Sequence, residues 1–143
     1  MGFISKTLLL FFNIIKANKI AFISSPSQLI CLNEFLYKNS IPKLLIIVGY
    51  PSTASISQLK SISKRLEYIK NQKLIFLSEI MSEVKFTIVL KFLKIVFIFK
   101  SVIIGNMNYY HSKGIYLWSK EVLFLDEGLN FLNLKKNETK IKQ

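Results

Sequence analysis

The sequence predicts an α/β fold built on a doubly wound, mainly parallel sheet. Short apolar runs alternate about five times with segments of helical periodicity, and the connections between them are short, a pattern typical of parallel sheets with crossover helices. Apolar residues make up 51% of the 143 residues, and the mean hydropathy is +0.38. Strands covered on both faces produce such values because they are apolar throughout instead of alternating.

The N-terminal lead-in, residues 1–18, contains an apolar segment at 3–16 that favours a helix. Asn13 interrupts this segment, which falls far short of the ~20 residues needed to cross a bilayer. A second apolar stretch, residues 86–104, contains three lysines, which are costly at bilayer depth. No small-residue cleavage site follows Ile15, so we expect neither a secretory signal nor a membrane span. A helix at 3–16 that associates with a membrane surface stays open.

The first strand and helix have the clearest local signals. Residues 19–24 form an apolar run that stops at a Ser-Pro-Ser-Gln sequence. Ser25 is predicted to be the N-cap of the helix and Pro26 its first residue, and Gln28 is the expected partner in a capping box. An apolar stripe then continues the helix to about Asn39.

The remaining elements follow at short intervals and complete one α/β domain over residues 19–134, followed by a polar tail at 135–143. In chain order we expect a strand at 44–48, a helix at 55–69, a strand at 74–77, a helix at 79–98, a strand at 101–105, a weak helical pattern within 108–119, and strands at 122–125 and 131–134.

The charge of the chain suggests an anionic partner of low specificity. The net charge is +12, but Arg65 is the single arginine among 20 basic residues. Arginine is favoured for bidentate contacts with phosphates and bases, and the lysines are scattered, so we expect no nucleic-acid partner. An anionic membrane surface would still attract the chain. One cysteine, Cys31, excludes an intrachain disulfide and fits the reducing cytoplasm, with peripheral contact to the inner membrane left open.

Several common site motifs are absent from the sequence. There is no G-x-G-x-x-G and no P-loop, so nucleotide phosphates are not held in those ways. A single histidine and a single cysteine exclude a Cys/His metal site, and the eight acidic residues form no clustered set of carboxylates. We therefore expect no metal and no cofactor.

The strand at 122–125 runs directly into Asp126, Glu127 and Gly128. A carboxylate at the carboxyl end of a strand can act as a general base, and a glycine beside it lets the backbone turn sharply or a sugar approach closely. Asp and Gly also commonly end strands for conformational reasons alone, and the residue types by themselves favour that simpler interpretation.

Three segments resemble the N-terminal half of bacterial lipooligosaccharide sialyltransferases of glycosyltransferase family 52 and their polysialyltransferase relatives. Residues 20–29 are similar to the family's opening strand and its small-Pro-x-Gln-Leu helix start. Residues 102–106 are similar to its strand-Gly-Asp/Asn turn, and residues 125–128 match its acidic-acidic-Gly motif. The order and spacing of the three segments also fit, over residues 19–134.

The resemblance implies a Rossmann-like N-terminal domain of a two-domain GT-B enzyme. That family moves sialic acid from CMP-sialic acid to a sugar hydroxyl with inversion and without a metal, and its acidic motif supplies the general base. Carried over, Asp126 or Glu127 would be the base. The resemblance also suggests four substrate-binding residues: Gly128, Ser25, Gln28 and Asn106. For Ser25 and Gln28 a capping role explains the residue types without a ligand.

One hallmark of the family departs from this sequence. The family has a His-Pro motif in a C-terminal domain that helps to hold CMP, whereas here the single histidine, His111, is followed by Ser112. The expectation is therefore the acceptor-side half of a truncated enzyme, inactive alone, that acts on lipooligosaccharide or capsule glycan. The alternative is a non-enzymatic α/β binding or interaction module, peripheral to the membrane or not. The oligomeric state is left open.

Overall fold

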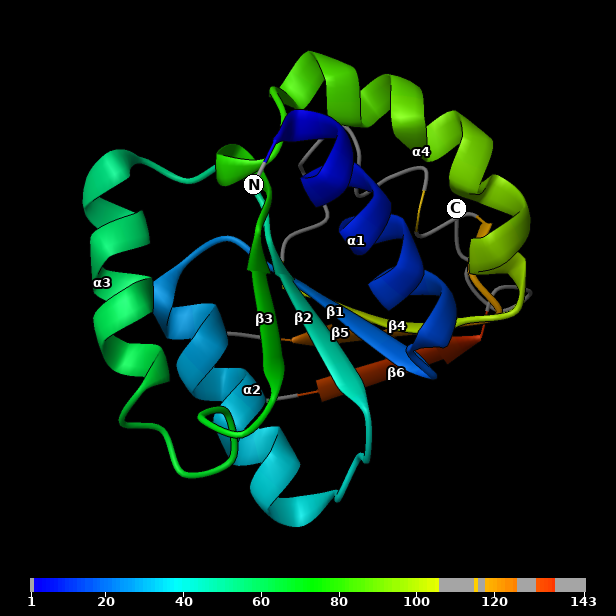
Figure 1. Ribbon diagram of the computed structural model, residues 1–143. Helices are drawn as coiled ribbons and strands as arrows, with labels where there is room; N and C mark the ends of the chain where they lie inside the picture. The colour runs from blue at the N-terminus through cyan, green and yellow to red at the C-terminus, as the bar shows by residue number, and fades with distance from the viewer. Residues whose placement is uncertain (1, 106–114, 116–117, 126–130, 136–143) are drawn as a thin grey trace.

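The computed structural model describes residues 2–105, 115, 118–125 and 131–135 (Figure 1). These residues contain a six-stranded sheet of order β3-β2-β1-β4-β5-β6. Its strands are β1 (Lys19–Ile23), β2 (Leu44–Val48), β3 (Lys73–Phe76), β4 (Ser101–Ile104), β5 (Glu121–Leu125) and β6 (Phe131–Lys135). The first five strands of this order pair in parallel and β6 pairs antiparallel with β5, so the predicted mainly parallel sheet is confirmed.

Helices cover the sheet from both sides, as the doubly wound prediction requires (Figure 1). One side carries α1 (Phe3–Lys16) and α4 (Glu83–Ile98), and the other carries α2 (Pro26–Lys38) and α3 (Thr53–Ser63). Each side has its own hydrophobic core, because successive strand residues point to opposite faces. In β1, Ile20 and Phe22 pack toward α1 and α4, while Ala21 and Ile23 pack toward α2 and α3.

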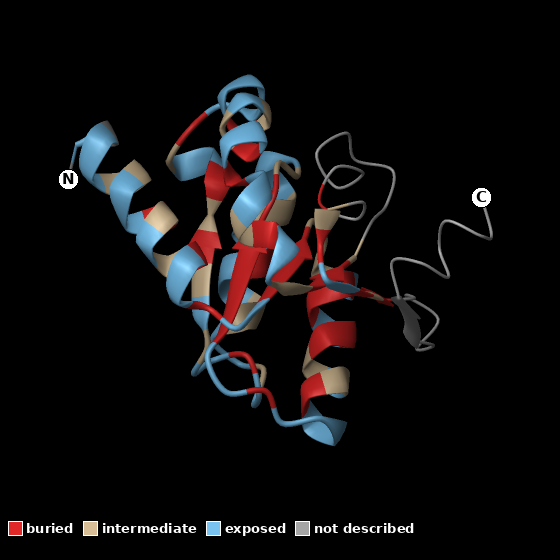
Figure 2. Ribbon diagram, turned by 90° about the vertical axis from the view of Figure 1, so that its right-hand side faces the viewer, coloured by how far each residue is buried: buried red, intermediate tan, exposed pale blue. Residues whose placement is uncertain are grey.

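The strands at the centre of the sheet are apolar throughout because both of their faces are covered. All five residues of β2 are buried, and four of the five residues of β1. Figure 2 shows this buried layer between helices whose outer surfaces are largely exposed. The high mean hydropathy thus has the origin that the sequence predicts.

The helix expected at 55–69 is shorter than predicted, because α3 ends at Ser63. The chain continues in tight turns, in which Arg65 N–H donates to the Ile62 carbonyl at 2.9 Å and Ile69 N–H to the Leu66 carbonyl at 3.1 Å. Ile69 is nevertheless buried. A three-residue apolar spacing is met equally by such turns, so the pattern identified the buried position but not the conformation.

The boundaries between the strand expected at 74–77 and the helix expected at 79–98 differ from the prediction. The strand ends at Phe76, and residues Leu77–Glu79 form a short 3₁₀ turn. The helix begins only at Glu83, because the Ser82 hydroxyl accepts a hydrogen bond from Lys85 N–H at 3.3 Å and caps it there. The short strand predicted at 131–134 is confirmed as β6. Within 108–119, Ile115 and Trp118 are helical, and the other residues, apart from Ser119, lie outside the described ones.

Candidate functional site

The sheet places a topological switch point between β1 and β4. From β1 the chain passes to β2 on one side, and it later returns to β4 on the other side. In open α/β sheets ligands bind in the crevice outside the carboxyl ends of the strands at such a point. Here that edge is formed by Ser24 and Ser25 after β1 and by Gly105 after β4. It is therefore the candidate site that the topology selects.

The side chain of Gln28 occupies this switch point and joins its two sides. Its Oε1 accepts hydrogen bonds from the Ser24 backbone N–H at 2.8 Å and from the Ser24 hydroxyl at 3.0 Å. Its Nε2 donates to the Gly105 carbonyl at 3.0 Å. The side chain is 3% exposed. The buried amide of Gln28 is thus paired with groups of both loops, as buried polar groups require.

Gly105 is matched to this arrangement by its lack of a side chain. A Cβ atom at position 105 would overlap the amide oxygen of Gln28 and lie 2.5 Å from its Cδ. Such a contact is closer than carbon atoms tolerate, so any other residue at 105 would force Gln28 to move. The two residues therefore form one packed unit at the centre of the candidate site.

Ser25 is the N-cap of α2, as the sequence predicts. Its hydroxyl accepts from Gln28 N–H at 3.3 Å, and Pro26 is the first residue of the helix. The predicted capping box is wrong in its second half, because the Gln28 side chain bonds to Ser24 N–H instead of to Ser25 N–H. The hydrogen bond from Gln28 Nε2 to the Gly105 carbonyl explains this difference, because it orients the amide so that Oε1 faces Ser24. Ser25 Oγ also lies 3.1 Å from the hydroxyl of Ser27, which is exposed.

The acidic motif follows the strand that borders this site. β5 pairs in parallel with β4, with Phe124 opposite Ile104, so its last residue, Leu125, lies at the same edge of the sheet as Gly105. The predicted residues Asp126, Glu127, Gly128 and Asn106 lie outside the described residues. Of the six residues predicted for the site, the structure describes Ser25 and Gln28 and brings them together.

Tyr50, after β2, is a further polar side chain near this edge, and the sequence did not single it out. Its hydroxyl lies 3.0 Å from the Met81 carbonyl and 3.2 Å from the Ser82 carbonyl, and donates to them. Burial, and secondly the negative charge of Glu83, raise the pKa of Tyr50 well above its usual value. Tyr50 therefore stays protonated and links the end of β2 to the start of α4. A tyrosine within a Gly-Tyr-Pro-Ser turn was the available signal.

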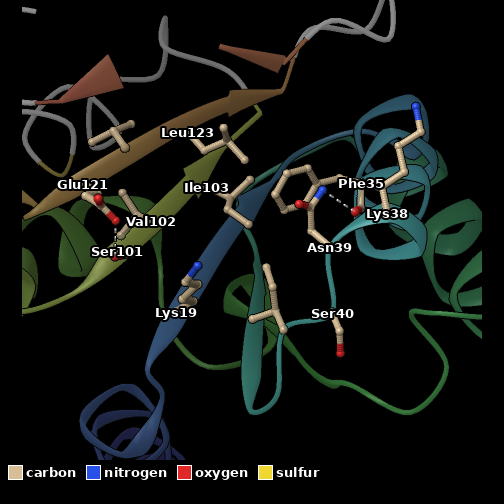
Figure 3. A pocket seen from close by; sticks show the side chains of 12 residues that line it. Lys19, Phe35, Lys38, Asn39, Ser40, Ser101, Val102, Ile103, Glu121 and Leu123 are labelled. Atoms are coloured by element: carbon tan, nitrogen blue, oxygen red, sulfur yellow. Dashed lines mark hydrogen bonds between the residues drawn. The ribbon is translucent and has the colours of Figure 1, made fainter. Parts of the chain in front are cut away.

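A hollow of about 670 Å³ lies at the opposite, amino edge of the sheet (Figure 3). The first residues of β1, β4 and β5 line it, namely Lys19, Ser101 and Glu121. The Ser101 hydroxyl donates to the Glu121 carboxylate at 3.2 Å. Neither Ser25 nor Gln28 reaches this hollow. Topology therefore separates it from the candidate site, since ligands of open α/β sheets bind at the carboxyl edge.

Within the described part of the chain, no group of three or more His, Cys, Asp or Glu side chains could hold a metal ion.

Comparison of the chain with protein-family models, with curated proteins and with solved structures gave no match in any of the three. The structure itself shows an α/β domain whose five parallel strands are flanked by helices, an arrangement compatible with a Rossmann-like fold.

Proposed function

We propose that this chain is the acceptor-side domain of a GT-B sialyltransferase that acts on a cell-surface glycan, lipooligosaccharide or capsule. The observation that carries the proposal is the parallel pairing of β5 with β4, which brings the end of β5 to the same edge as the switch point. The acidic motif begins at the next residue, Asp126. In open α/β sheets, the residues that follow the carboxyl ends of such strands are the ones that hold substrates.

The proposed reaction needs one base from this domain. Asp126, or Glu127 beside it, would take the proton from an acceptor hydroxyl as that oxygen bonds to the anomeric carbon of sialic acid. The bond between that carbon and the CMP phosphate oxygen breaks, and the phosphate leaves with the electron pair. Attack from the opposite face inverts the anomeric centre. The donor and its binding half are implied by the resemblance, and the base is the contribution of this chain.

Gln28 would serve such a site by fixing the positions of the two loops that form its base. Its three hydrogen bonds to Ser24 and Gly105 keep the loops after β1 and β4 at a defined separation. A sugar that contacted Gln28 directly would have to replace those bonds, whereas Ser25 and Ser27 present hydroxyls at a less buried position. We therefore assign Gln28 the role of a positioning residue.

Binding of an acceptor glycan by the purified chain tests the proposal. The probe is the core oligosaccharide of lipooligosaccharide with its lipid removed, and the measurement is saturation-transfer NMR, which detects weak binding. Hydrogen bonds to a charged group contribute about 1.5–3 kcal/mol, so we expect Asp126→Asn to weaken binding by about tenfold or more.

Glu121→Gln provides the matched control, because Glu121 begins the same strand at the opposite edge and loses the same charge. We expect it to bind the oligosaccharide like the unaltered chain. No saturation transfer to a folded chain would contradict the proposal. Loss of binding in Glu121→Gln but not in Asp126→Asn would also contradict it, because the sugar would then occupy the hollow at the amino edge.

The second candidate is a non-enzymatic interaction module, in which Asp126 and Glu127 merely end a strand. It is favoured by the large apolar residues that α1 and α4 expose to solvent. For such a module, Asp126→Asn would leave every binding function unchanged. The same pair of variants therefore separates the two candidates.

A further inference from the structure

Helix α1 carries two apolar stripes, of which only one is covered. Leu10, Ile14 and Ala17, the last just beyond its end, pack into the core. The second stripe repeats at the same helical spacing on the outward side. Its members are exposed by the following fractions: Ile4 73%, Leu8 61%, Phe12 58% and Ile15 58%. The outward side of this helix therefore also presents large apolar side chains.

Helix α4 repeats this arrangement over its full length. Phe86, Leu90, Leu93 and Phe97 form its buried stripe. The outward stripe has the same four, four and three spacing as that of α1 and is exposed to a similar degree: Val84 72%, Ile88 53%, Phe92 80%, Ile95 71% and, after the helix, Phe99 75%. Large apolar side chains that repeat along the outer side of a helix in this way are normally covered, by protein or by lipid.

The two outward stripes lie on the same side of the sheet, since α1 and α4 share one hydrophobic core (Figure 1). We call these nine residues the α1/α4 face. The helices on the other side provide the comparison: among the described residues, α3 exposes no large apolar side chain and α2 exposes two, Ile30 and Tyr37. Exposed apolar surface is thus concentrated on one side of the molecule, and concentrated patches of this kind mark interaction sites.

The charges around the α1/α4 face decide what kind of partner it fits. The two helices carry five lysines, Lys6, Lys16, Lys85, Lys91 and Lys94, against one acidic residue, Glu83. The ammonium of Lys16 lies 5.0 Å from the centre of the Phe12 ring, directly beside the exposed stripe. A second copy of this face would set lysines against lysines, so self-association is disfavoured. The partner must be apolar and negatively charged together.

We propose that the α1/α4 face docks onto an anionic lipid bilayer. Phe and Ile side chains would enter the boundary between headgroups and acyl chains, and the lysines would reach the negative headgroups, as in helices that lie in the membrane plane. Nothing in the described residues is a helix of the length and apolarity needed to cross a membrane. The contact is therefore peripheral, and it uses two helices instead of residues 3–16 alone.

Flotation of the full chain with vesicles tests this proposal. The vesicles consist of phosphatidylcholine alone or with about 30% phosphatidylglycerol, which gives them a negative surface. We expect binding to the anionic vesicles and a decrease as salt is raised, because salt screens the lysine contacts. The double variant Ile15→Ser/Ile95→Ser removes one apolar contact from each helix. We expect its affinity for the anionic vesicles to fall by about tenfold or more.

Two matched controls keep the result interpretable. Ile30→Ser makes the same chemical change on the opposite side of the molecule and should bind normally. Lys16→Gln/Lys91→Gln should lose the preference for anionic vesicles, whereas Lys38→Gln/Lys64→Gln, with the same net charge, should keep it. Circular dichroism and the melting temperature show that each variant is folded, which the exposure of the altered side chains leads us to expect.

Three outcomes would overturn the proposal. One is a folded chain that binds neither kind of vesicle. Another is equal binding by Ile15→Ser/Ile95→Ser and the unaltered chain. The third is a stable dimer in sedimentation that this double variant dissociates, which would make a second copy the occupant. Because the glycan probe carries no lipid and Asp126 is not part of the α1/α4 face, Asp126→Asn should bind vesicles normally. The two proposals can therefore fail separately.

Discussion

Gln28 shows how one side chain can stabilise the centre of an α/β sheet. Its amide group bonds to residues on both sides of the switch point, and one of those bonds joins positions 77 residues apart in the chain. Its partners are the Ser24 N–H, the Ser24 hydroxyl and the Gly105 carbonyl, so removal of the amide leaves partly buried donors and an acceptor without these hydrogen bonds. The Gln28 side chain therefore fills the space between the loops after β1 and β4 at the switch point.

Gln28→Ala should lower the free energy of unfolding by about 1–3 kcal/mol, because it removes the hydrogen bonds to partly buried groups of Ser24 and Gly105. Gly105→Ala should cost about 1–3 kcal/mol because its new methyl group overlaps the Gln28 amide. Urea denaturation of both single variants and of the double variant gives the coupling. We expect Gly105→Ala to be nearly harmless once Gln28 is absent. Additive effects would show that the two residues do not act together.

Tyr50 predicts a specific sensitivity to alkaline pH. Its pKa is raised in the folded chain, whereas the unfolded chain releases the proton near pH 10. The contribution of this group to stability is therefore complete below about pH 10 and declines as the pH rises above it. Between pH 8 and pH 10.5 the decline is at most about 0.8 kcal/mol, and less because the half-buried phenol is partly screened.

The variant Tyr50→Phe removes this titration together with the hydrogen bond to the Met81 and Ser82 carbonyls. It should be less stable than the unaltered chain at pH 8 by about 1 kcal/mol. From pH 8 to pH 10.5 it should lose less stability than the unaltered chain. Tyr68→Phe, which changes an exposed tyrosine, corrects for the general effect of high pH. Parallel curves for Tyr50→Phe and the unaltered chain would contradict the assignment.

At the scale of elements, Lys100 attaches the end of α1 to the start of β4. Its ammonium donates to the Ile15 carbonyl at 2.7 Å and to the Ala17 carbonyl. The last carbonyls of a helix have no intrahelical partner and attract a cation. Lys100 therefore satisfies the end of α1 and fixes that helix against the sheet.

Lys100→Met should destabilise the chain by about 1 kcal/mol, the low end for a charged hydrogen bond. The low value is expected because burial lowers the pKa of Lys100, so desolvation offsets part of the gain. Chemical denaturation measures the change, with the exposed Lys91→Met as control. Hydrogen exchange should show faster opening of α1 in Lys100→Met. Equal stability of the two variants would mean that the contact adds nothing.

At the scale of the whole molecule, the two sides of the sheet differ in what they present to the surroundings. Among the described residues of α2 and α3, only Ile30 and Tyr37 are exposed large apolar residues, whereas α1 and α4 expose an apolar stripe on the side that faces away from the core. Since each side buries its own core against the same sheet, this difference is not needed for folding. It therefore points to a partner, and the proposed bilayer contact would leave the carboxyl edge of the sheet to bind the glycan.

Local patterns in the sequence were enough for the fold class and for most elements. Strand runs such as residues 44–48 are apolar because both faces are covered, and Ser25 and Pro26 mark a helix start in any context. The same local rules failed where two conformations share one pattern. The three-residue spacing near Ile69 fits either a helix or tight turns. The apolar run by itself predicts that the helix starts at residue 79, whereas the cap at Ser82 makes it start at Glu83.

The sequence by itself determined the alternation of strands and helices, the two-sided burial of the sheet and the cap at Ser25, because each depends on neighbours within a few residues. Only the tertiary structure decided the strand order, the partner of Gln28 and the exposure of the α1/α4 face. The bond from Gln28 to Gly105 forms because β1 and β4, which are far apart in the sequence, pair side by side in the sheet. The packing of the helices against the sheet determines which apolar side chains of α1 and α4 are covered and which stay exposed.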